Sequence, residues 1–321
     1  MARARVNLGV DLGGVQLPTP VLGASGTFGS GRELSPILDL SKVGGIVTKS
    51  VTLRPVKGLP TPRMVETPSG MLNAIGLQNP GIDEFMEKEG PFIRRVGVPV
   101  FLSIAGKSVE EFVQVAMRAQ NIPGVVALEA NISCPNVERR NQVFACHPDA
   151  AAEVVGAVAR LSRLPVFAKL TPDVTDIAEV AEACVRAGAH GISLINTLLA
   201  MAIDVETFRP KLGGVTGGLS GPAIRPVAVR AVYQVARALP EVPIIGMGGI
   251  RSARDAVEFL LAGAWAVAVG TASFWNPEAV ADVGRGIGEF LVQRGLRSPA
   301  GLRARVVVQE EEAGEPAHRG G

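Results

Sequence analysis

The feature that most limits the fold is a regular alternation of short apolar runs with stretches of helical periodicity. Eight apolar, β-rich runs are found, at Pro20–Ala24, Gly45–Thr48, Pro99–Ile104, Val125–Asn131, Val166–Leu170, Gly191–Asn196, Pro243–Met247 and Ala266–Gly270. The helical stretches lie at Val109–Asn121, Ala150–Leu161, Ile177–Ala187, Ile224–Leu239 and Ala253–Ala262. Most of the runs are almost continuously apolar, as expected of parallel strands covered by helices. The alternation therefore predicts an α/β fold, either a (β/α)8 barrel or a doubly wound sheet.

The residues that follow the apolar runs favour the barrel. They are small, polar or ionisable after almost every run, at Ser25-Gly26-Thr27, Lys49-Ser50, Ser103, Asn131-Ile132-Ser133-Cys134, Lys169-Leu170-Thr171, Asn196-Thr197, Gly248-Gly249 and Gly270-Thr271. In a barrel all these strand ends meet at one mouth. A doubly wound sheet would carry a G-x-G-x-x-G turn, which the sequence lacks. We predict one (β/α)8 TIM-barrel domain over residues 1–308, followed by a polar, disordered tail over residues 309–321.

Two longer segments interrupt the alternation. One runs from Thr52 to Phe92 and the other from Leu198 to Gly221, and both are rich in glycine. Loops of this length at a barrel mouth usually cover or bind a ligand. We expect both insertions to lie at the C-terminal mouth of the barrel.

Composition and charge exclude several other classes of protein. Of 321 residues, 47% are hydrophobic and the formal net charge is +2, with no stripe of basic residues that could follow a nucleic acid backbone. The longest uncharged stretch, Phe259–Pro277, is broken by glycine and proline, and the N-terminus lacks the apolar core of a signal peptide. Three cysteines without a C-x-x-C pair fit neither a disulfide framework nor a four-cysteine cluster. We expect a cytoplasmic protein with neither nucleic acid nor membrane as partner.

The last two apolar runs end in glycine turns that are each followed by a helix. These turns contain Gly248, Gly249, Gly270 and Thr271. Backbone N–H groups and helix N-termini would converge there, and barrels commonly hold phosphate in these two loops. The alternative is that the glycines only make tight turns between strand and helix.

Two lysines end strands that are otherwise apolar, Lys49 and Lys169. A lysine directed into a barrel mouth is costly unless it meets an anion or takes part in chemistry. Lys169 could form a Schiff base or stabilise a developing anion, and the residues alone leave both open. The alternative for both is a solvated surface lysine.

Cys134 is the cysteine with polar neighbours, in the string Asn-Ile-Ser-Cys-Pro-Asn. Its thiol could be a nucleophile or a general base, one that works best at mildly alkaline pH. Cys146 and Cys184 are interpreted as small core residues. The histidines His147, His190 and His318 lie at none of the strand ends and lack metal-ligand spacing, so we expect no metal and no histidine base.

Several long motifs occur together and in order. They are Lys49-Ser50, Asn-Ala-Ile-Gly-Leu-Gln-Asn-Pro-Gly, Asn-Ile-Ser-Cys-Pro-Asn, Ile-Asn-Thr-Leu-Leu, Gly-Gly-Leu-Ser-Gly-Pro-Ala-Ile and Gly-Met-Gly-Gly-Ile. With them the chain, from about residue 6 to residue 290, resembles dihydroorotate dehydrogenase. It is most similar to the NAD-linked catalytic subunits of class 1B, as judged by Ile-Asn-Thr-Leu-Leu and the tract after it.

The resemblance implies an FMN cofactor and the oxidation of dihydroorotate to orotate in pyrimidine biosynthesis. The cofactor-binding positions it implies are Ser25, Lys49, Ser50, Ser103, Asn131, Lys169, Ile195 and Gly221, with the phosphate at Gly248, Gly249, Gly270 and Thr271. The substrate-binding positions it implies are Lys49, Asn73, Ala74, Ile75, Gly76, Leu77, Asn131, Asn196 and Thr197. It further implies that Cys134 removes a proton from carbon 5 while a hydride leaves carbon 6 for the flavin, and that Lys169 stabilises negative charge on the reduced flavin.

The sequence departs from the family pattern at Ser103, where related chains commonly carry Asn. The shorter side chain is expected to weaken one flavin contact. The segment Glu138–Gln142, after Cys134, also lacks the glycines often found there.

The resemblance also implies partners. Electrons would leave through a separate subunit that carries FAD and a 2Fe–2S cluster and reduces NAD⁺, and the catalytic subunits would form a homodimer. Three alternatives stay open: a related flavin enzyme for another dihydropyrimidine, a cofactor-free Schiff-base lyase or isomerase for phosphosugars that uses Lys169, and a non-catalytic barrel that binds a partner.

Overall fold

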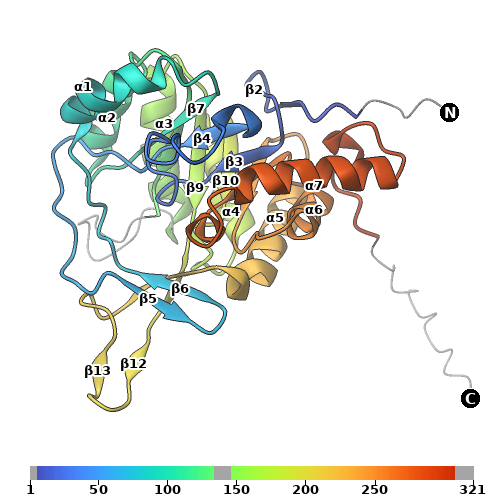
Figure 1. The fold of residues 1–321 in the computed structure, drawn as a ribbon. Coiled ribbons are helices and arrows are strands. Elements are labelled where there is room, and N and C mark those ends of the chain that lie inside the picture. The colour runs from blue at the N-terminus through green and yellow to red at the C-terminus, as the bar shows by residue number, and fades with distance from the viewer. Residues whose placement is uncertain (1–5, 134–145, 308–321) are drawn as a thin grey trace, which may run out of the picture.

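Eight parallel strands close into a barrel in a computed structural model that describes residues 6–133 and 146–307 (Figure 1). The strands are β3 Val21–Gly23, β4 Gly45–Val47, β7 Val100–Ile104, β8 Val125–Asn131, β9 Val166–Leu170, β10 Gly191–Leu194, β15 Ile244–Met247 and β16 Ala266–Val269. Each pairs in parallel with the next along the chain, and β16 pairs with β3. The (β/α)8 barrel and all eight predicted strands are confirmed. Cys134, residues 138–142 and the tail over residues 309–321 lie outside the described residues.

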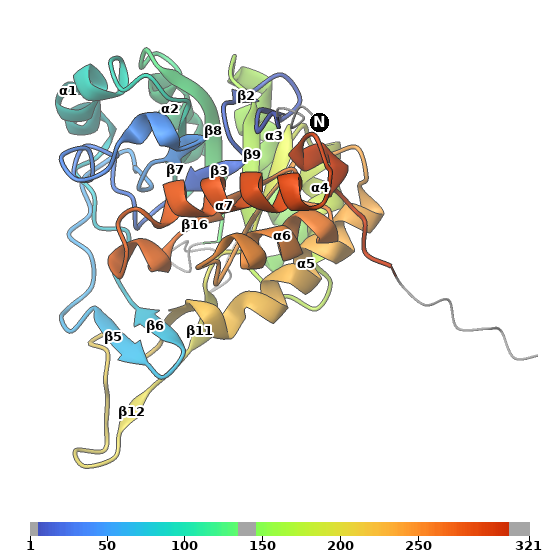
Figure 2. The same ribbon diagram turned by 45° about the vertical axis from the view of Figure 1, so that its right-hand side comes forward.

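Helices surround the barrel on its outer face (Figure 2). They are α1 Ile82–Ile93, α2 Val109–Ala119, α3 Pro148–Leu161, α4 Ile177–Arg186, α5 Arg225–Ala238, α6 Ala253–Ala262 and α7 Ala279–Gln293. Polar side chains cap several N-termini: Ser108 accepts from the backbone N–H of Glu111 in α2, and Ser252 with Asp255 forms a capping box in α6. None of the helices in the described segments has the length and apolar composition needed to cross a membrane.

Two parts of the helical layer differ from the prediction. The first insertion, expected to extend to Phe92, ends at Gly81, because Ile82–Ile93 forms the helix that connects β4 to β7. Between β3 and β4 the chain forms only turns and the short 3₁₀ helix η1, Leu40–Lys42, within the described part of the chain. The five predicted helices are confirmed, with ends that differ by no more than about two residues, a scatter usual for helix termini.

The half of the barrel interior that lies away from the mouth is a packed apolar core. Phe101 and Phe167 meet there edge to face, with ring centroids 5.4 Å apart. The hairpin of β1, Val10–Asp11, and β2, Gln16–Leu17, covers the opening at the N-terminal ends of the strands. His190 is hydrogen-bonded to the carbonyl oxygen of Gly13 at 2.7 Å in this region, at the end of the barrel opposite the mouth. Apolar side chains therefore fill the interior at the N-terminal ends of the strands, and a site is expected at the C-terminal ends.

The two insertions form one antiparallel sheet over the barrel mouth. Its strands, in the order β11-β14-β6-β5, are β11 Leu198–Ala200, β14 Gly217–Ser220, β6 Gly70–Asn73 and β5 Met64–Thr67. A Cβ atom at Gly70 would lie 2.0 Å from the carbonyl oxygen of Ser220, so only glycine allows β6 to approach β14 this closely. We call this the mouth sheet.

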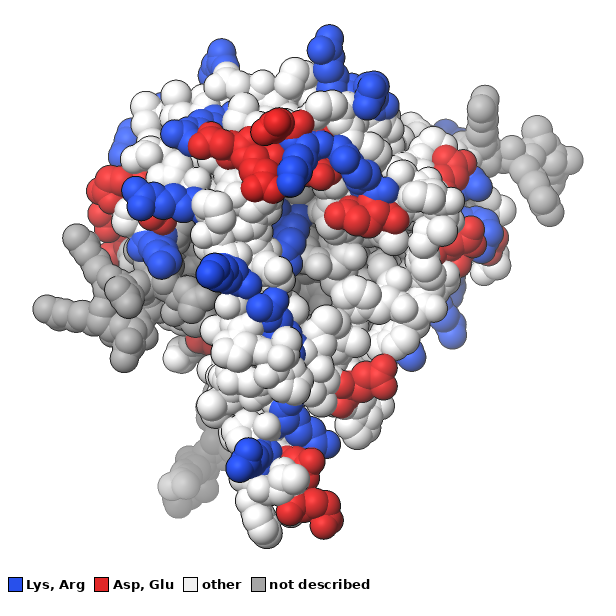
Figure 3. Space-filling view, turned by 60° about the vertical axis from the view of Figure 1, so that its left-hand side comes forward, with Lys and Arg blue, Asp and Glu red and all other residues white. Residues whose placement is uncertain are grey.

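A hairpin projects beyond the mouth sheet, at the lower left of Figure 1. It consists of β12, Ile203–Asp204, and β13, Arg209–Pro210. Its apolar side chains are exposed to solvent, with Phe208 at 87% and Val205 at 73%. Figure 3 shows basic and acidic side chains beside uncharged surface on the projecting part of the molecule.

Candidate active site

An open cavity of about 810 Å³ lies between the carboxyl ends of the barrel strands and the mouth sheet. This is within the range of pockets that hold cofactors and small substrates. The predicted site residues that line it are Ser25, Lys49, Ser50, Asn73, Ala74, Ile75, Gly76, Leu77, Asn131, Lys169, Ile195, Asn196, Thr197, Gly221, Gly248, Gly249, Gly270 and Thr271. Of the predicted site residues that the structure describes, Ser103 alone is absent from the lining.

A chain of hydrogen bonds joins polar side chains from four strand ends. Ser50 Oγ lies 2.9 Å from Ser103 Oγ and accepts from Asn131 Nδ2 at 2.9 Å. Asn131 Oδ1 in turn accepts from Asn196 Nδ2 at 3.2 Å, and Asn196 accepts from the backbone N–H of Thr197. Ser103 is fully buried at the base of this chain, where it fixes Ser50 and does not reach the cavity. Mutual bonding of this kind holds the amide groups in one orientation toward a ligand.

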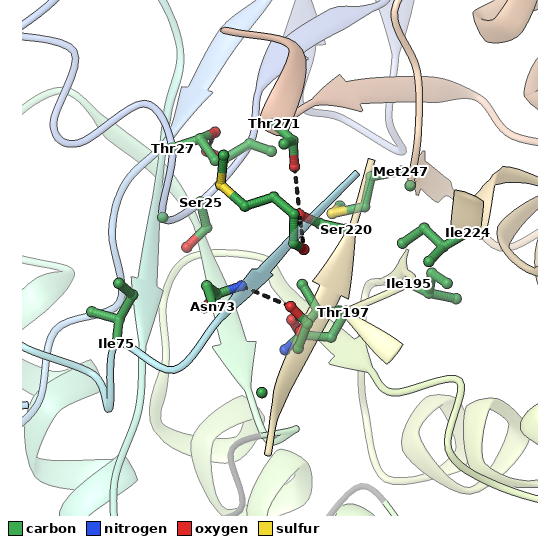
Figure 4. A pocket seen from close by; sticks show the side chains of 18 of the residues that line it. Ser25, Thr27, Asn73, Ile75, Ile195, Thr197, Ser220, Ile224, Met247 and Thr271 are labelled. Atoms are coloured by element: carbon green, nitrogen blue, oxygen red, sulfur yellow. Dashed lines mark hydrogen bonds between the residues drawn. The ribbon is translucent and has the colours of Figure 1, made fainter. Parts of the chain in front are cut away.

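One corner of the cavity contains Gly248 and Gly249, whose backbone conformations favour glycine, and we call it the glycine corner. Gly248 and Gly249 have φ angles of 132° and 77°, and a Cβ atom at Gly249 would lie 2.7 Å from the carbonyl oxygen of Gly221. The backbone N–H groups of these two glycines donate no hydrogen bond within the described residues. Both glycines line the cavity, so their N–H groups are free to donate to a ligand, and this corner is suited to an anion. Thr271 Oγ1 donates to Ser220 Oγ at 2.7 Å and joins the corner to the mouth sheet (Figure 4).

Apolar side chains form another part of the wall. Met247, Ile195 and Ile224 lie together on one side of the view in Figure 4, whereas Ser25 and Ile75 lie on the other. Met71 and Leu59 add further apolar surface from the first insertion. The cavity therefore combines apolar walls with a few polar groups, the usual composition of a site for a small molecule.

The two lysines of the cavity have different electrostatic surroundings. Burial lowers the pKa of the Lys49 ammonium, and the positive charge of Arg63 lowers it further. Lys169 is almost completely buried, and its Nζ lies 3.8 Å from Oε1 of Glu129. Within the described residues Lys49 forms no ion pair, so Lys49 is the better attractor for an incoming anion.

Arg63 and Glu129 are residues that sequence reasoning missed. Arg63 follows no strand, and it is held by the side chain of Gln78 at 2.6 Å and by the carbonyl oxygens of Leu59 and Lys57. Glu129 is an acidic residue in the middle of an apolar strand, which is a signal that could have identified it.

Cys146 corrects one sequence interpretation and Cys184 confirms another. Cys184 is fully buried in α4, and burial raises its pKa to about 12. Cys146, also interpreted as a core residue, is only half-buried and lines the cavity, where its Sγ lies 3.8 Å from the carbonyl oxygen of Asp173. Burial and the Asp173 carboxylate raise the pKa of the Cys146 thiol, which makes its thiolate scarce at neutral pH.

Asp173 ties the mouth sheet to the barrel and was also missed. Its carboxylate oxygens both lie 3.2 Å from the backbone nitrogen of Leu199 in β11, and one accepts from Thr171 Oγ1 at 3.0 Å. Among the described side chains, no group of three or more His, Cys, Asp or Glu is placed to hold a metal ion.

Comparison with known proteins agrees with this geometry. A family model described as dihydroorotate dehydrogenase matches residues 7–291. The chain belongs to the dihydroorotate dehydrogenase family. This is a family of flavin-dependent oxidoreductases, and the resemblance drawn from the sequence motifs is confirmed.

Similar proteins carry the name "dihydroorotate dehydrogenase B (NAD(+)), catalytic subunit". The protein of Geotalea daltonii is 54% identical over 91% of this chain and 96% of its own length. Those of Trichlorobacter lovleyi and Desulforudis audaxviator are 53% and 54% identical over 92% and 91% of this chain, and over 97% and 95% of their own lengths. The words "catalytic subunit" in these names of dihydroorotate dehydrogenases imply a further subunit.

Lys49 should lose its proton at a lower pH than an ordinary lysine, because burial and then Arg63 disfavour the charged form. The test is the pH midpoint of Lys49 labelling by an amine reagent, read by mass spectrometry. Replacement of Arg63 by Met should raise this midpoint without restoring an ordinary value, since burial, the larger cause, remains. Replacement of the exposed Arg95 by Met is the control, and an unchanged midpoint in Arg63→Met would contradict the assignment.

Proposed function

We propose that this chain oxidises dihydroorotate to orotate with FMN bound at the barrel mouth. The observation that carries the proposal is one cavity that brings together an anion-binding glycine corner, a chain of fixed amide side chains and two lysines. Family membership supports the same reaction class. Orotate formation is a step of pyrimidine biosynthesis.

FMN fits the cavity with its phosphate at the glycine corner. Gly248, Gly249, Gly270 and Thr271 would hold the phosphate, where unsatisfied N–H groups support an anion. The remaining positions proposed to contact the cofactor are Ser25, Lys49, Ser50, Asn131, Lys169, Ile195 and Gly221. Ser103 would act through Ser50, so its short side chain costs a flavin contact but keeps Ser50 in place. Bound FMN supplies the hydride acceptor for the oxidation.

The substrate is proposed to lie against Lys49 and the mouth sheet. Lys49 forms no ion pair within the described residues, and Arg63 adds positive charge close by, which suits the carboxylate of dihydroorotate. Asn131, Asn196 and Thr197 offer hydrogen bonds to the pyrimidine ring. Asn73, Ala74, Ile75, Gly76 and Leu77 would complete the substrate site from the first insertion.

Cys134 is proposed as the base, on the strength of the family motif. In the oxidation its thiolate takes the proton of carbon 5, and the hydride of carbon 6 leaves with its electron pair, so that a carbon–carbon double bond forms. The ammonium of Lys169 stabilises the negative charge that the ring system gains. Cys146, the half-buried cysteine of the cavity, has a raised pKa and is the poorer base.

The electron outlet is proposed to be a second subunit that carries FAD and a 2Fe–2S cluster and passes electrons to NAD⁺. The name of the relatives supports a second subunit, and the three cysteines of this chain are too few for a four-cysteine cluster of its own. A reducing cytoplasm is the location that this cysteine usage supports.

A second copy of this chain is proposed to cover the projecting hairpin. Ile203, Val205 and Phe208 are all exposed on this hairpin, and a group of exposed apolar side chains marks an interaction site more often than a single one does. Asp204 and Glu206 lie on the same hairpin as Arg209 and Lys211, so two copies related by a twofold axis offer opposite charges to each other.

The isolated protein should be yellow, and dihydroorotate added without oxygen should bleach its flavin absorbance. Dihydrouracil at the same concentration should leave the absorbance unchanged, and NAD⁺ should not restore the colour without a second subunit. Equal bleaching by dihydrouracil would assign the enzyme to another dihydropyrimidine. A colourless protein that borohydride links to a phosphosugar at Lys169 would replace the proposal with the Schiff-base alternative.

Replacement of Cys134 by Ser should slow flavin reduction by dihydroorotate about 100-fold or more at neutral pH, the usual contribution of a general base. The deficit should narrow as pH rises, and FMN should stay bound. Stopped-flow absorbance measures the rate. Cys146→Ser is the matched control and should stay within about twofold of the parent protein; parity between the Cys134 and Cys146 variants would refute the role of Cys134.

The double replacement Val205→Asn and Phe208→Asn should weaken the dimer about tenfold or more, because each removes apolar area from the interface. Asn is chosen because Phe208 has a φ angle of 57°, which Asn tolerates. Dilution series followed by light scattering measure the dimer affinity. Ile37→Asn, at another exposed apolar side chain, is the control, and a dimer of unchanged affinity in the double variant would exclude the hairpin.

A further inference from the structure

Glu129 is a carboxylate inside the barrel that the proposed reaction does not use. It lies on β8, two residues beyond Ala127 of the apolar interior, and its side chain is 1% exposed. Its Oε1 atom is buried and accepts no hydrogen bond within the described part of the structure. A buried carboxylate oxygen without a donor is costly, so its charge must be balanced in another way.

Lys169 is the charge that balances it. Strands β8 and β9 lie side by side in the barrel (Figure 2). Their register pairs Lys169 with Asn131, two residues beyond Glu129, and Lys169 Nζ lies 3.8 Å from Glu129 Oε1. The other polar side chains of this layer are neutral: Ser103 is bonded to Ser50, and Ser193, in register with Lys169, has a buried hydroxyl without a partner.

The two charges of the ion pair lie at different distances from the cavity. Lys169 lines the cavity and Glu129 does not, so the ammonium lies between the carboxylate and the space for a ligand. Buried ion pairs contribute little net stability compared with apolar residues of similar size. An ion pair at the floor of a cavity is therefore better explained by what it does to a bound ligand.

We propose that Glu129 is a positioning residue that anchors the Lys169 ammonium at the cavity floor and offsets part of its charge. It thereby sets how strongly the site stabilises negative charge on a bound flavin ring. The inference rests on the proposed function for the identity of the ring, whereas the ion pair itself stands on the geometry of the protein.

The ion pair is tested on flavin-free protein by urea unfolding of the parent and three variants, Glu129→Gln, Lys169→Met and the double variant. Each single change leaves one buried charge alone, so each should lower the unfolding midpoint. The double variant should unfold at a higher urea concentration than either single variant. Midpoints that fall additively, with the double variant lowest, would overturn the pairing. If a single variant fails to accumulate, recovery of folded protein in the double variant supports the pair and a double variant that is also unfolded opposes it.

The effect on the ring is tested by the two-electron midpoint potential of bound flavin at neutral pH. Glu129→Gln removes the offsetting charge, so reduced flavin gains stability and the midpoint should become more positive. Ser193→Ala, which removes a neutral buried hydroxyl from the same layer, is the matched control and should leave the potential unchanged. An unchanged or more negative potential in Glu129→Gln overturns the tuning role.

These readouts separate the inference from the proposed function. If the protein binds no flavin but the double variant still unfolds at a higher urea concentration than either single variant, the proposed function is contradicted and the ion pair is supported. Protein that binds flavin and is reduced by dihydroorotate, but whose potential ignores Glu129, keeps the proposed function and contradicts the inference.

Discussion

Closure of the barrel determines where every side chain of the site can lie. Alternate residues of each strand must point into the interior, and the strands are held in register by hydrogen bonds around the whole ring. The site therefore begins two residues beyond the apolar core: Ala127 is followed by Glu129, and Phe167 by Lys169. The next inward-facing residue on each of these strands is therefore polar and lies at the floor of the cavity. Phe101 and Phe167 pack directly beneath this floor and support it.

The mouth sheet adds what the strand ends cannot provide. Strands β6 and β14 come from insertions far apart in the chain, and their pairing places Asn73 Nδ2 3.2 Å from the carbonyl oxygen of Gly218. Ser220 in the same sheet bonds Thr271 at the glycine corner, and Asp173 holds β11 to the loop after β9. The proposed substrate segment and the proposed phosphate site are thus parts of one bonded framework, so a change in either insertion affects both ends of the cavity.

Local pattern was sufficient for the barrel and for the polar residues that line the cavity at the strand ends, because strand period and strand-end polarity are short-range properties. The lining residues Asn73 to Leu77, Ile195 and Gly221 were predicted only from the resemblance to the family. Local pattern was insufficient for α1, which starts after Gly81 without a side-chain cap and contains Pro91, so that it resembles the insertion before it. The mouth sheet depends on pairing between distant segments, which periodicity does not encode. Cys146 was misjudged because burial is decided by tertiary contacts. The burial of Ser103 against Ser50 is likewise a tertiary contact, which the sequence could not show.

The contrast between the two lysines gives each a separate task. Lys49, without an ion-pair partner in the described structure and beside Arg63, gains most when an anion arrives, so in the proposed reaction its charge would favour the bound substrate in its ground state. The positive charge of Lys169 is already partly balanced by Glu129, so a ligand without negative charge near the Lys169 ammonium adds little electrostatic stabilisation. In the proposed reaction Lys169 would respond mainly to negative charge that develops on the flavin ring, and interactions that strengthen in the transition state are the ones that lower the barrier. Among the described residues, the carboxylate of Glu129 beside Lys169 and the absence of one beside Lys49 therefore support separate roles for the two lysines in the proposed reaction, one in binding and one in catalysis.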